Sequence, residues 1–185
     1  MKLPLVVRVL RDVFADKTRQ RISEQEVSIL CEQLVRAIRE SYTPNLVVAI
    51  ATGGSAPGEI IARLLHVPIA HLVIRREINI TRRYSLDPIP LRWIMSVYHH
   101  YLFQTTKPTI SKGISVDISG KRVLIVEDMV HTGATIDVAI KYLSMANVSQ
   151  IKTVSLGFAA ERRADFSVLP LGNYCFPWSK DFNNP

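Results

Sequence analysis

Two adjacent carboxylates, Glu127 and Asp128, stand directly after an apolar run and shortly before the hydroxylated turn 132–135, TGAT. Adjacent acids can accept hydrogen bonds from sugar hydroxyl groups, or hold a metal ion directly or through water. Backbone N–H groups in a turn that leads into a helix form a binding site for a phosphate dianion. A ligand with a phosphate at one end and a diol nearby would use both halves.

These residues require a strand before them and a helix after them. The continuous apolar run Val123–Val126 predicts a strand buried on both faces, as in a parallel sheet. A turn is expected over Met129–Ala134. An amphipathic helix then begins near Thr135, and its apolar face carries Ile136, Ala139, Ile140 and Leu143.

A second strand–turn–helix unit precedes the first. Leu46–Ile50 is predicted as its strand and Glu59–Leu65 as its helix. In the turn between them, Gly53 and Gly54 leave the backbone uncovered and free to adopt unusual dihedral angles. Further strands are predicted at 69–74 and 151–158, and a short strand or arm at 4–10. Ser23 and Glu26 form a capping box that opens a helix ending before residue 44.

Composition indicates one soluble domain of 185 residues, with 48% hydrophobic and 21% charged residues. The net charge of +7 and the arginine pairs at 75–76, 82–83 and 162–163 would attract phosphorylated ligands or nucleic acid. The two cysteines, Cys31 and Cys175, form no disulfide framework, which favours a reducing cytoplasm. The first ten residues lack a signal-peptide pattern, and no apolar run is long enough to span a membrane.

The run from Val123 to Thr135 resembles the signature of type I phosphoribosyltransferases. The resemblance implies binding of phosphoribosyl pyrophosphate (PRPP). It assigns the ribose hydroxyls to Glu127 and Asp128, which are expected to be catalytic and to hold Mg²⁺, directly or through water. It assigns the 5-phosphate to the loop residues Met129, Val130, Thr132, Gly133, Ala134 and Thr135.

Residues 24–68 resemble the N-terminal half of the purine phosphoribosyltransferases, with the xanthine/hypoxanthine type as the nearest pattern. The resemblance implies pyrophosphate binding by Thr52, Gly53 and Gly54. Relatives often carry arginine or lysine where this chain has Thr52. Positive charge for the pyrophosphate is therefore expected from Arg75 or Arg76.

The tail is similar to the aromatic hood of the same type, in which a segment ending in Pro-Trp covers the base. The hood residues expected to bind the base are Tyr174, Phe176 and Trp178, with Tyr174 as the stacking ring. The alternative is that these aromatic residues fill the core. Relatives carry a lysine after the fifth strand, where this chain has alanines at 159 and 160.

His131 takes the position of an aspartate that, in relatives, meets the ring nitrogen of the purine. A histidine can perform general acid–base catalysis there, because its unperturbed pKa is about 6.5. The alternative is that its ring only fills the loop.

The fold expected is α/β, with a mainly parallel sheet flanked by helices and the ligand crevice at the carboxyl ends of the strands. One domain should span residues 1–185. Residues 78–118 would form a flap or insertion, whose helix at about 90–104 covers the reaction or contacts another subunit. Residues 159–185 would form the hood.

The implied function is phosphoribosyl transfer from PRPP to a nucleobase, a purine, with release of pyrophosphate and with Mg²⁺ as cofactor, as in purine salvage. PRPP and the base would be the partners of a cytoplasmic homo-oligomer, without membrane or nucleic acid. One alternative is a PRPP-sensing regulator that binds nucleic acid through the arginine pairs and has little or no transferase activity. Another is a phosphatase or transferase acting on a different sugar phosphate.

Overall fold

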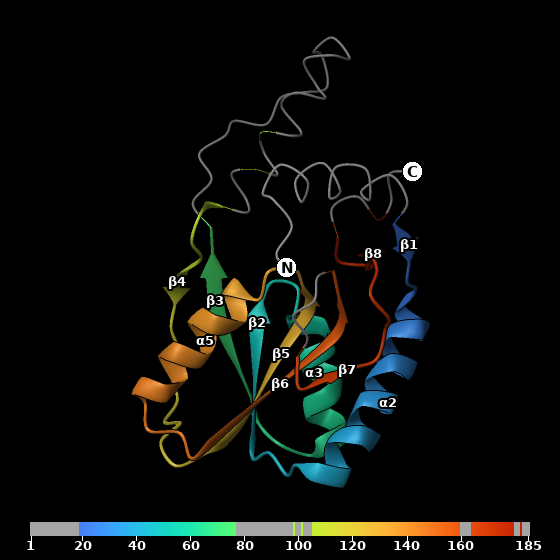
Figure 1. Cartoon of the computed structure of the whole chain (residues 1–185). Helices are drawn as coiled ribbons and strands as arrows, with labels where there is room; N and C mark the ends of the chain where they lie inside the picture. The colour runs from blue at the N-terminus through green and yellow to red at the C-terminus, as the bar shows by residue number, and fades with distance from the viewer. Residues whose placement is uncertain are drawn as a thin grey trace.

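The computed structural model of the chain describes residues 19–76, 98, 101, 105–159, 164–179 and 182. Its main sheet has the strand order β4-β3-β2-β5-β6-β7, in which β4 is antiparallel to β3 and the other neighbours are parallel (Figure 1). The strands are β2 (Leu46–Ala51), β3 (Ile69–Arg75), β4 (Thr109–Lys112), β5 (Arg122–Val130), β6 (Gln150–Phe158) and β7 (Phe166–Ser167). The predicted α/β class with a mainly parallel sheet is confirmed.

Helices cover both faces of the sheet. Helices α2 (Glu24–Ser41) and α3 (Ser55–Leu65) lie on one face, and α5 (Ala134–Met145) lies on the other (Figure 1). Successive residues of β5 alternate between two cores, because side chains along a strand point to opposite faces. Leu124 joins the core under α2 and α3, whereas Ile125 joins the core under α5.

The capping box predicted for α2 is present. The backbone N–H of Glu26 donates to Ser23 Oγ at 3.3 Å, and Ser23 N–H donates to Glu26 Oε2 at 2.7 Å. Helix α3 begins at Ser55 rather than at the predicted Glu59. Pro57 lies in its first turn, where the missing N–H removes no helical hydrogen bond.

Strand β5 is longer than the sequence suggested. It was expected to end at Val126, but pairing with β6 continues as far as Val130, opposite Phe158. Glu127 and Asp128 therefore lie within the strand, and the turn begins at His131 rather than at Met129. The apolar run did not predict this extension, because parallel strands pair through their backbones and polar residues can pair in the same way.

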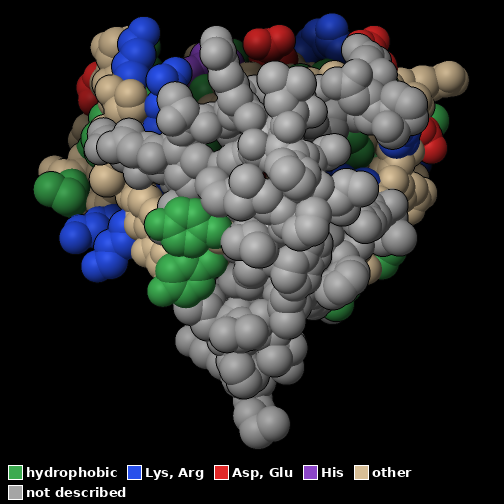
Figure 2. All heavy atoms as spheres, turned by 90° about the horizontal axis from the view of Figure 1, so that it is seen from above, with side chains coloured by type: hydrophobic (Ala, Val, Ile, Leu, Met, Phe, Trp, Pro, Cys, Tyr) green, Lys and Arg blue, Asp and Glu red, His purple; other side chains and the backbone are tan. Residues whose placement is uncertain are grey.

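A second, two-stranded sheet lies above the helical layer of α2. Its strands are β1 (Gln20–Arg21) and β8 (Tyr174–Cys175), which pair in parallel (Figure 1). The predicted hood at 159–185 is thus divided, since β7 belongs to the main sheet and only the part after it pairs with β1. In Figure 2, which looks onto this end of the molecule, both acidic and basic side chains lie around the visible rim.

Part of the chain lies outside the described residues, including the arm at 4–10 and most of the flap at 78–118. In the predicted helix at 90–104, Tyr98 and Tyr101 are described and are helical. Thr109–Lys112, within the predicted flap, forms the edge strand β4. No helix among the described residues is long and apolar enough to cross a membrane.

Candidate functional site

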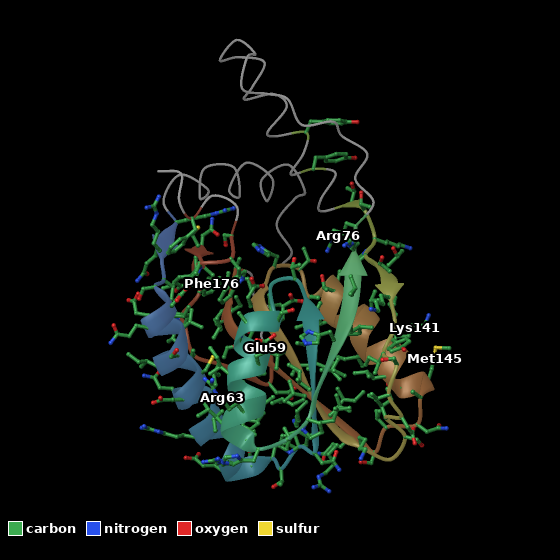
Figure 3. The ribbon with its side chains drawn as sticks, turned by 180° about the vertical axis from the view of Figure 1, so that it is seen from behind. Glu59, Arg63, Arg76, Lys141, Met145 and Phe176 are labelled. Carbon is green, nitrogen blue, oxygen red and sulfur yellow. The ribbon has the colours of Figure 1, made fainter. Side chains whose placement is uncertain are left out.

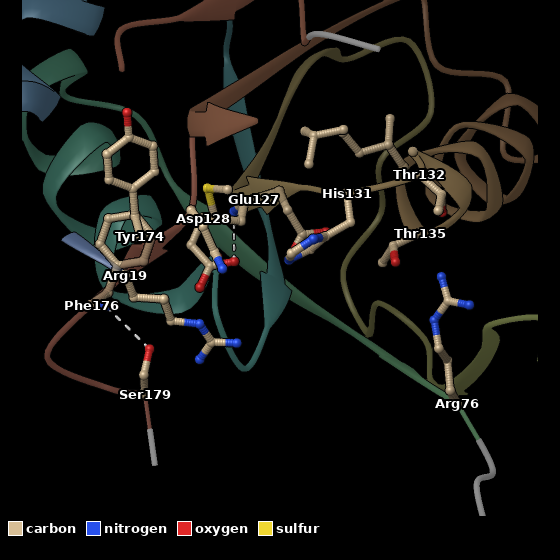
Figure 4. A pocket seen from close by; sticks show the side chains of 15 residues that line it. Arg19, Arg76, Glu127, Asp128, His131, Thr132, Thr135, Tyr174, Phe176 and Ser179 are labelled. Carbon is tan, nitrogen blue, oxygen red and sulfur yellow. Dashed lines mark hydrogen bonds between the residues drawn. The ribbon is translucent and has the colours of Figure 1, made fainter. Parts of the chain in front are cut away.

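A cavity of about 260 Å³ opens where the carboxyl end of β5 meets the two-stranded sheet. Figure 4 shows Arg76, Thr132 and Thr135 on one side of the acid pair, and Arg19, Tyr174, Phe176 and Ser179 on the other. The lining residues are Arg19, Arg76, Glu127, Asp128, Met129, Val130, His131, Thr132, Gly133, Thr135, Ile136, Asn173, Tyr174, Phe176 and Ser179. The cavity therefore has one side lined by Arg76, Thr132 and Thr135 and an aromatic side lined by the hood.

The sheet topology explains why the cavity forms here. β2 and β5 are neighbours, but the chain passes from β2 to β3 on one side and from β5 to β6 on the other. The loops that leave β2 and β5 therefore diverge and leave a crevice at their carboxyl ends, which is where open α/β sheets bind ligands.

The acid pair is the electrostatic centre of the cavity. Burial raises the pKa of Glu127 well above its ordinary value, the neighbouring Asp128 raises it further, and Arg76 opposes the shift. Burial likewise lowers the pKa of Arg76, while Glu127 opposes that shift. Arg76 also donates a hydrogen bond to the carbonyl oxygen of Thr106 at 2.5 Å. A dication or a sugar hydroxyl would relieve the unfavourable burial of the Glu127 carboxylate.

Asp128 is held on both carboxylate oxygens. Oδ1 accepts a hydrogen bond from the backbone N–H of Met129 at 2.7 Å, and Oδ2 accepts one from the indole N–H of Trp178 at 2.8 Å. Gly53 lies so close that a β-carbon there would be 2.4 Å from both oxygens. The carboxylate of Asp128 is thus the point where the β2 loop, the β5 strand and the hood meet.

The turn after β5 leads directly into α5, which begins at Ala134, one residue before the expected position. Gly133 is the N-cap of α5 and adopts the left-handed conformation, with φ of 77°. That conformation favours glycine, and it allows the chain to enter α5 directly from the turn. Thr132 Oγ1 accepts a hydrogen bond from Ala134 N–H at 3.4 Å. The N-terminus of α5 thus opens onto the cavity beside Thr132 and Thr135.

The residues predicted to bind pyrophosphate are only partly brought together. Arg76 lines the cavity, whereas Arg75 is exposed on β3 and is not among the lining residues; Figure 3 shows Arg76 at the carboxyl end of that strand. Thr52 is exposed, and its peptide bond with Ala51 is cis. Gly54 is buried, and a β-carbon there would be 2.3 Å from the carbonyl oxygen of Val126.

The aromatic residues of the hood take different roles. Tyr174 and Phe176 line the cavity, although both are buried, and the Tyr174 hydroxyl donates to the carbonyl oxygen of Pro170 at 3.0 Å. Trp178 is not among the lining residues. Its ring stacks on Phe176 with centroids 5.1 Å apart and planes inclined by 8°, and its N–H holds Asp128.

Sequence reasoning missed three polar residues of the cavity, Arg19, Asn173 and Ser179. Arg19 precedes β1, far from every motif, and no local pattern marks it. Only the pairing of Gln20 with Tyr174 brings it to the cavity. Ser179 closes the hood turn, where its hydroxyl accepts a hydrogen bond from Phe176 N–H at 3.2 Å.

The acid pair suits Mg²⁺ delivered with a diphosphate. Among the described residues, no three His, Cys, Asp or Glu side chains form a metal-binding cluster. Mg²⁺ is commonly bound by one or two carboxylates together with substrate phosphates and water. Glu127 and Asp128 fit that limited ligand set.

The fold and cavity define a class of α/β proteins with a ligand crevice at the carboxyl ends of a mainly parallel sheet. The chain belongs to the phosphoribosyl transferase domain family, whose profile matches residues 18–166. This match places it among the phosphoribosyltransferases and confirms the resemblance carried by the β5 motif. No curated protein sequence matches the chain.

Solved structures of similar fold include several purine phosphoribosyltransferases. The purine phosphoribosyltransferase of Pyrococcus horikoshii aligns with a TM-score of 0.68 and 22% identity, over 88% of this chain and 95% of that one. The xanthine-guanine-hypoxanthine enzyme of Helicobacter pylori gives 0.64 and 14%, over 90% and 95%. A Staphylococcus aureus hypoxanthine phosphoribosyltransferase gives 0.58 and 18%, over 82% and 76%. At these identities the likeness is one of fold.

Proposed function

We propose that this chain transfers the phosphoribosyl group of PRPP to a purine base and releases pyrophosphate. The observation that carries the proposal is the single cavity in which the acid pair of β5 separates a helix N-terminus from an aromatic hood. Such a cavity matches a ligand with a phosphate, a diol and a flat ring in sequence. The purine phosphoribosyltransferases among the structural neighbours support the choice of a purine.

The residues divide the work of binding. The turn at Thr132–Thr135 and the N-terminus of α5 receive the 5-phosphate. Glu127 accepts hydrogen bonds from the ribose hydroxyls, while Asp128 keeps its place through Met129 and Trp178. Mg²⁺, held by this pair with the diphosphate, would neutralise charge on the departing pyrophosphate. Positioning and electrostatic stabilisation account for most of the rate enhancement.

His131 is proposed to handle the proton of the reaction. A base nitrogen forms its bond to C1 of the ribose as the bond from C1 to the pyrophosphate oxygen breaks, and the nitrogen loses its proton. His131 lines the cavity on the exposed turn after β5, so its imidazole can accept that proton.

The proposal is tested by incubating the protein with PRPP, Mg²⁺ and each of adenine, hypoxanthine, guanine and xanthine, and by measuring pyrophosphate release. We expect release with at least one base. His131→Ala should lower kcat by about 10²–10⁴-fold and leave PRPP affinity unchanged. PRPP binding without turnover on any of the bases would overturn the transferase assignment. A His131→Ala variant as fast as wild type would remove that residue from the mechanism.

We also propose a reducing compartment, because both cysteines are free. Burial raises the pKa of the Cys31 thiol to about 12, so this thiol stays protonated and unreactive. Cys31 and Cys175 are both buried free cysteines.

A further inference from the structure

Arg19 lies on the aromatic side of the cavity and is fixed there by backbone pairing. Gln20, the next residue, pairs with Tyr174, and its N–H donates to the carbonyl oxygen of Asn173 at 3.1 Å. Arg19 is half-buried, and Figure 4 shows its guanidinium directed into the cavity on the side of Tyr174 and Phe176. Its backbone position is therefore set by the same strand that carries the hood ring.

The positive charge on the aromatic side of the cavity comes from Arg19. The lining residues include two guanidinium groups, and the other, Arg76, lies across the acid pair beside Thr132 and Thr135 (Figure 4). The other lining residues of the hood, Asn173, Tyr174, Phe176 and Ser179, are uncharged. Phe176 has no polar side-chain atom, and the Tyr174 hydroxyl already donates to the carbonyl oxygen of Pro170.

A guanidinium discriminates strongly between purines, because it donates hydrogen bonds from a planar fork and accepts none. The edge of a 6-oxopurine presents two acceptors, O6 and N7, which an arginine can bind simultaneously. In adenine the same edge presents an amino group, whose N–H bonds face those of the guanidinium. The two N–H donors of an arginine therefore find two acceptors on a 6-oxopurine, whereas on adenine one of them meets the amino group.

We infer that Arg19 contacts the base and makes the site selective for 6-oxopurines, such as hypoxanthine and guanine, over adenine. This inference rests on the proposed function, for which it names the substrate class. It also assigns a binding role to the segment immediately before β1, which lies outside the motifs of β2 and β5.

The test compares Arg19→Gln and Arg19→Lys with wild type. Arg21→Gln serves as the matched control, because Arg21 is exposed on β1, two residues after Arg19, and does not line the cavity. Activity is measured as kcat/KM for hypoxanthine, guanine and adenine. Affinities for IMP and AMP are measured by calorimetry, which requires no turnover. PRPP affinity in the absence of base is measured in parallel.

Arg19→Gln should lower kcat/KM for the two oxopurines by about 5- to 150-fold, the range expected for one bidentate arginine–purine contact. The kcat/KM for adenine should not fall. The ratio of the affinities for IMP and AMP should fall by a factor similar to that for the oxopurines. For Arg19→Lys, both values should lie between those of Arg19→Gln and wild type, because lysine keeps the positive charge but lacks the planar pair of donors. Arg21→Gln and PRPP affinity should match wild type.

Three outcomes would overturn the inference: an unchanged preference for IMP over AMP in Arg19→Gln, an equal loss in Arg21→Gln, or a loss of PRPP affinity that accounts for the whole effect. Failure of the proposed function has a different signature, which is the absence of pyrophosphate release from the wild-type protein with every base. The nucleotide affinities still test Arg19 in that case.

Discussion

At the scale of single residues, the two adjacent carboxylates of β5 are not equivalent. Both oxygens of Asp128 accept hydrogen bonds, from Met129 and from Trp178. The pKa of Glu127 is raised both by its burial and by the negative charge of the neighbouring Asp128. Asp128 is therefore held in one orientation, while the buried Glu127 carboxylate is in an unfavourable electrostatic environment that a bound ligand would relieve.

The Glu127 carboxyl should make folding stability depend on pH. Its pKa is higher in the folded than in the unfolded protein, so the stability that its proton provides is complete below about pH 4.5 and is lost as the pH rises through the folded value. Glu127→Gln removes this loss. Its melting temperature should equal that of wild type near pH 4 and exceed it increasingly toward pH 8.

Thermal unfolding across pH 4 to 8 measures this difference, and calorimetry should show that Glu127→Gln weakens PRPP binding. Glu59→Gln is the control, because Glu59 is exposed on α3 (Figure 3). A Glu127→Gln difference that stays constant over the whole pH range would contradict the argument.

At the scale of elements, the site depends on a close approach between the loop after β2 and strand β5. A β-carbon at Gly53 would lie 2.4 Å from the Asp128 oxygens. The carboxylate cannot move aside without breaking its hydrogen bonds to Met129 and Trp178. The glycine is therefore required by packing against an acid, rather than by its own backbone angles.

Gly53→Ala should consequently destabilise the fold by about 1–3 kcal/mol, as overpacking does, and lower PRPP affinity at least tenfold. Gly120→Ala is the matched control: Gly120 has a positive φ of 68° and open space around its missing side chain. It should cost about 1–2 kcal/mol from backbone strain alone and leave PRPP affinity intact. Denaturant titration and calorimetry separate the two effects. Normal PRPP affinity in Gly53→Ala would show that the two loops do not depend on each other.

The elements that were predictable from sequence are those defined by local patterns. The capping box of α2 and the apolar runs of β2, β3 and β6 each carry their own signal, and the structure confirms them. The extension of β5 through the acid pair, the edge strand β4 and the pairing of β1 with β8 carry none. These features depend on the partner strand, and the residues of one strand do not specify which strand will be its partner. Arg19 was missed for the same reason.

At the scale of the whole molecule, a large sheet and a two-stranded sheet share one cavity. The indole N–H of Trp178 in the hood joins them by donating to Asp128 in β5. Tyr174 and Phe176 also belong to the core cluster under α2. The hood is thus held by apolar packing, by the hydrogen bond from Gly172 N–H to the carbonyl oxygen of Phe158 at 3.1 Å, and by the charged hydrogen bond from Trp178 to Asp128.

Trp178→Phe should release the hood from the sheet. The ring stack on Phe176 can be retained, but Asp128 loses a donor, at a cost of about 1.5–3 kcal/mol for a hydrogen bond to a charged group. Hydrogen exchange should accelerate at the amides of Gln20 and Ile22, which bond to β8 and its flank, and remain slow in α2.

Tyr142→Phe is the control, because it removes a hydrogen bond to Ile114 N–H on the α5 side of the sheet. It should leave the exchange of the hood amides unchanged. Exchange at those amides that is equally slow in Trp178→Phe and wild type would mean that the Trp178–Asp128 hydrogen bond does not hold the hood.

The pairing of β1 with β8 also sets an order of events during biosynthesis. β1 is among the earliest segments described, yet its partner emerges from the ribosome roughly 150 residues later, a delay on the order of 10 s at ordinary translation rates. The sheet strands β2 to β6, with the turn Thr132–Thr135, are all synthesised in that interval. A nascent chain would therefore complete the β5 side of the cavity, where we propose that the sugar phosphate binds, well before the hood side. The selectivity for the base that we propose would thus depend on a strand, β8, that is synthesised after the turn Thr132–Thr135.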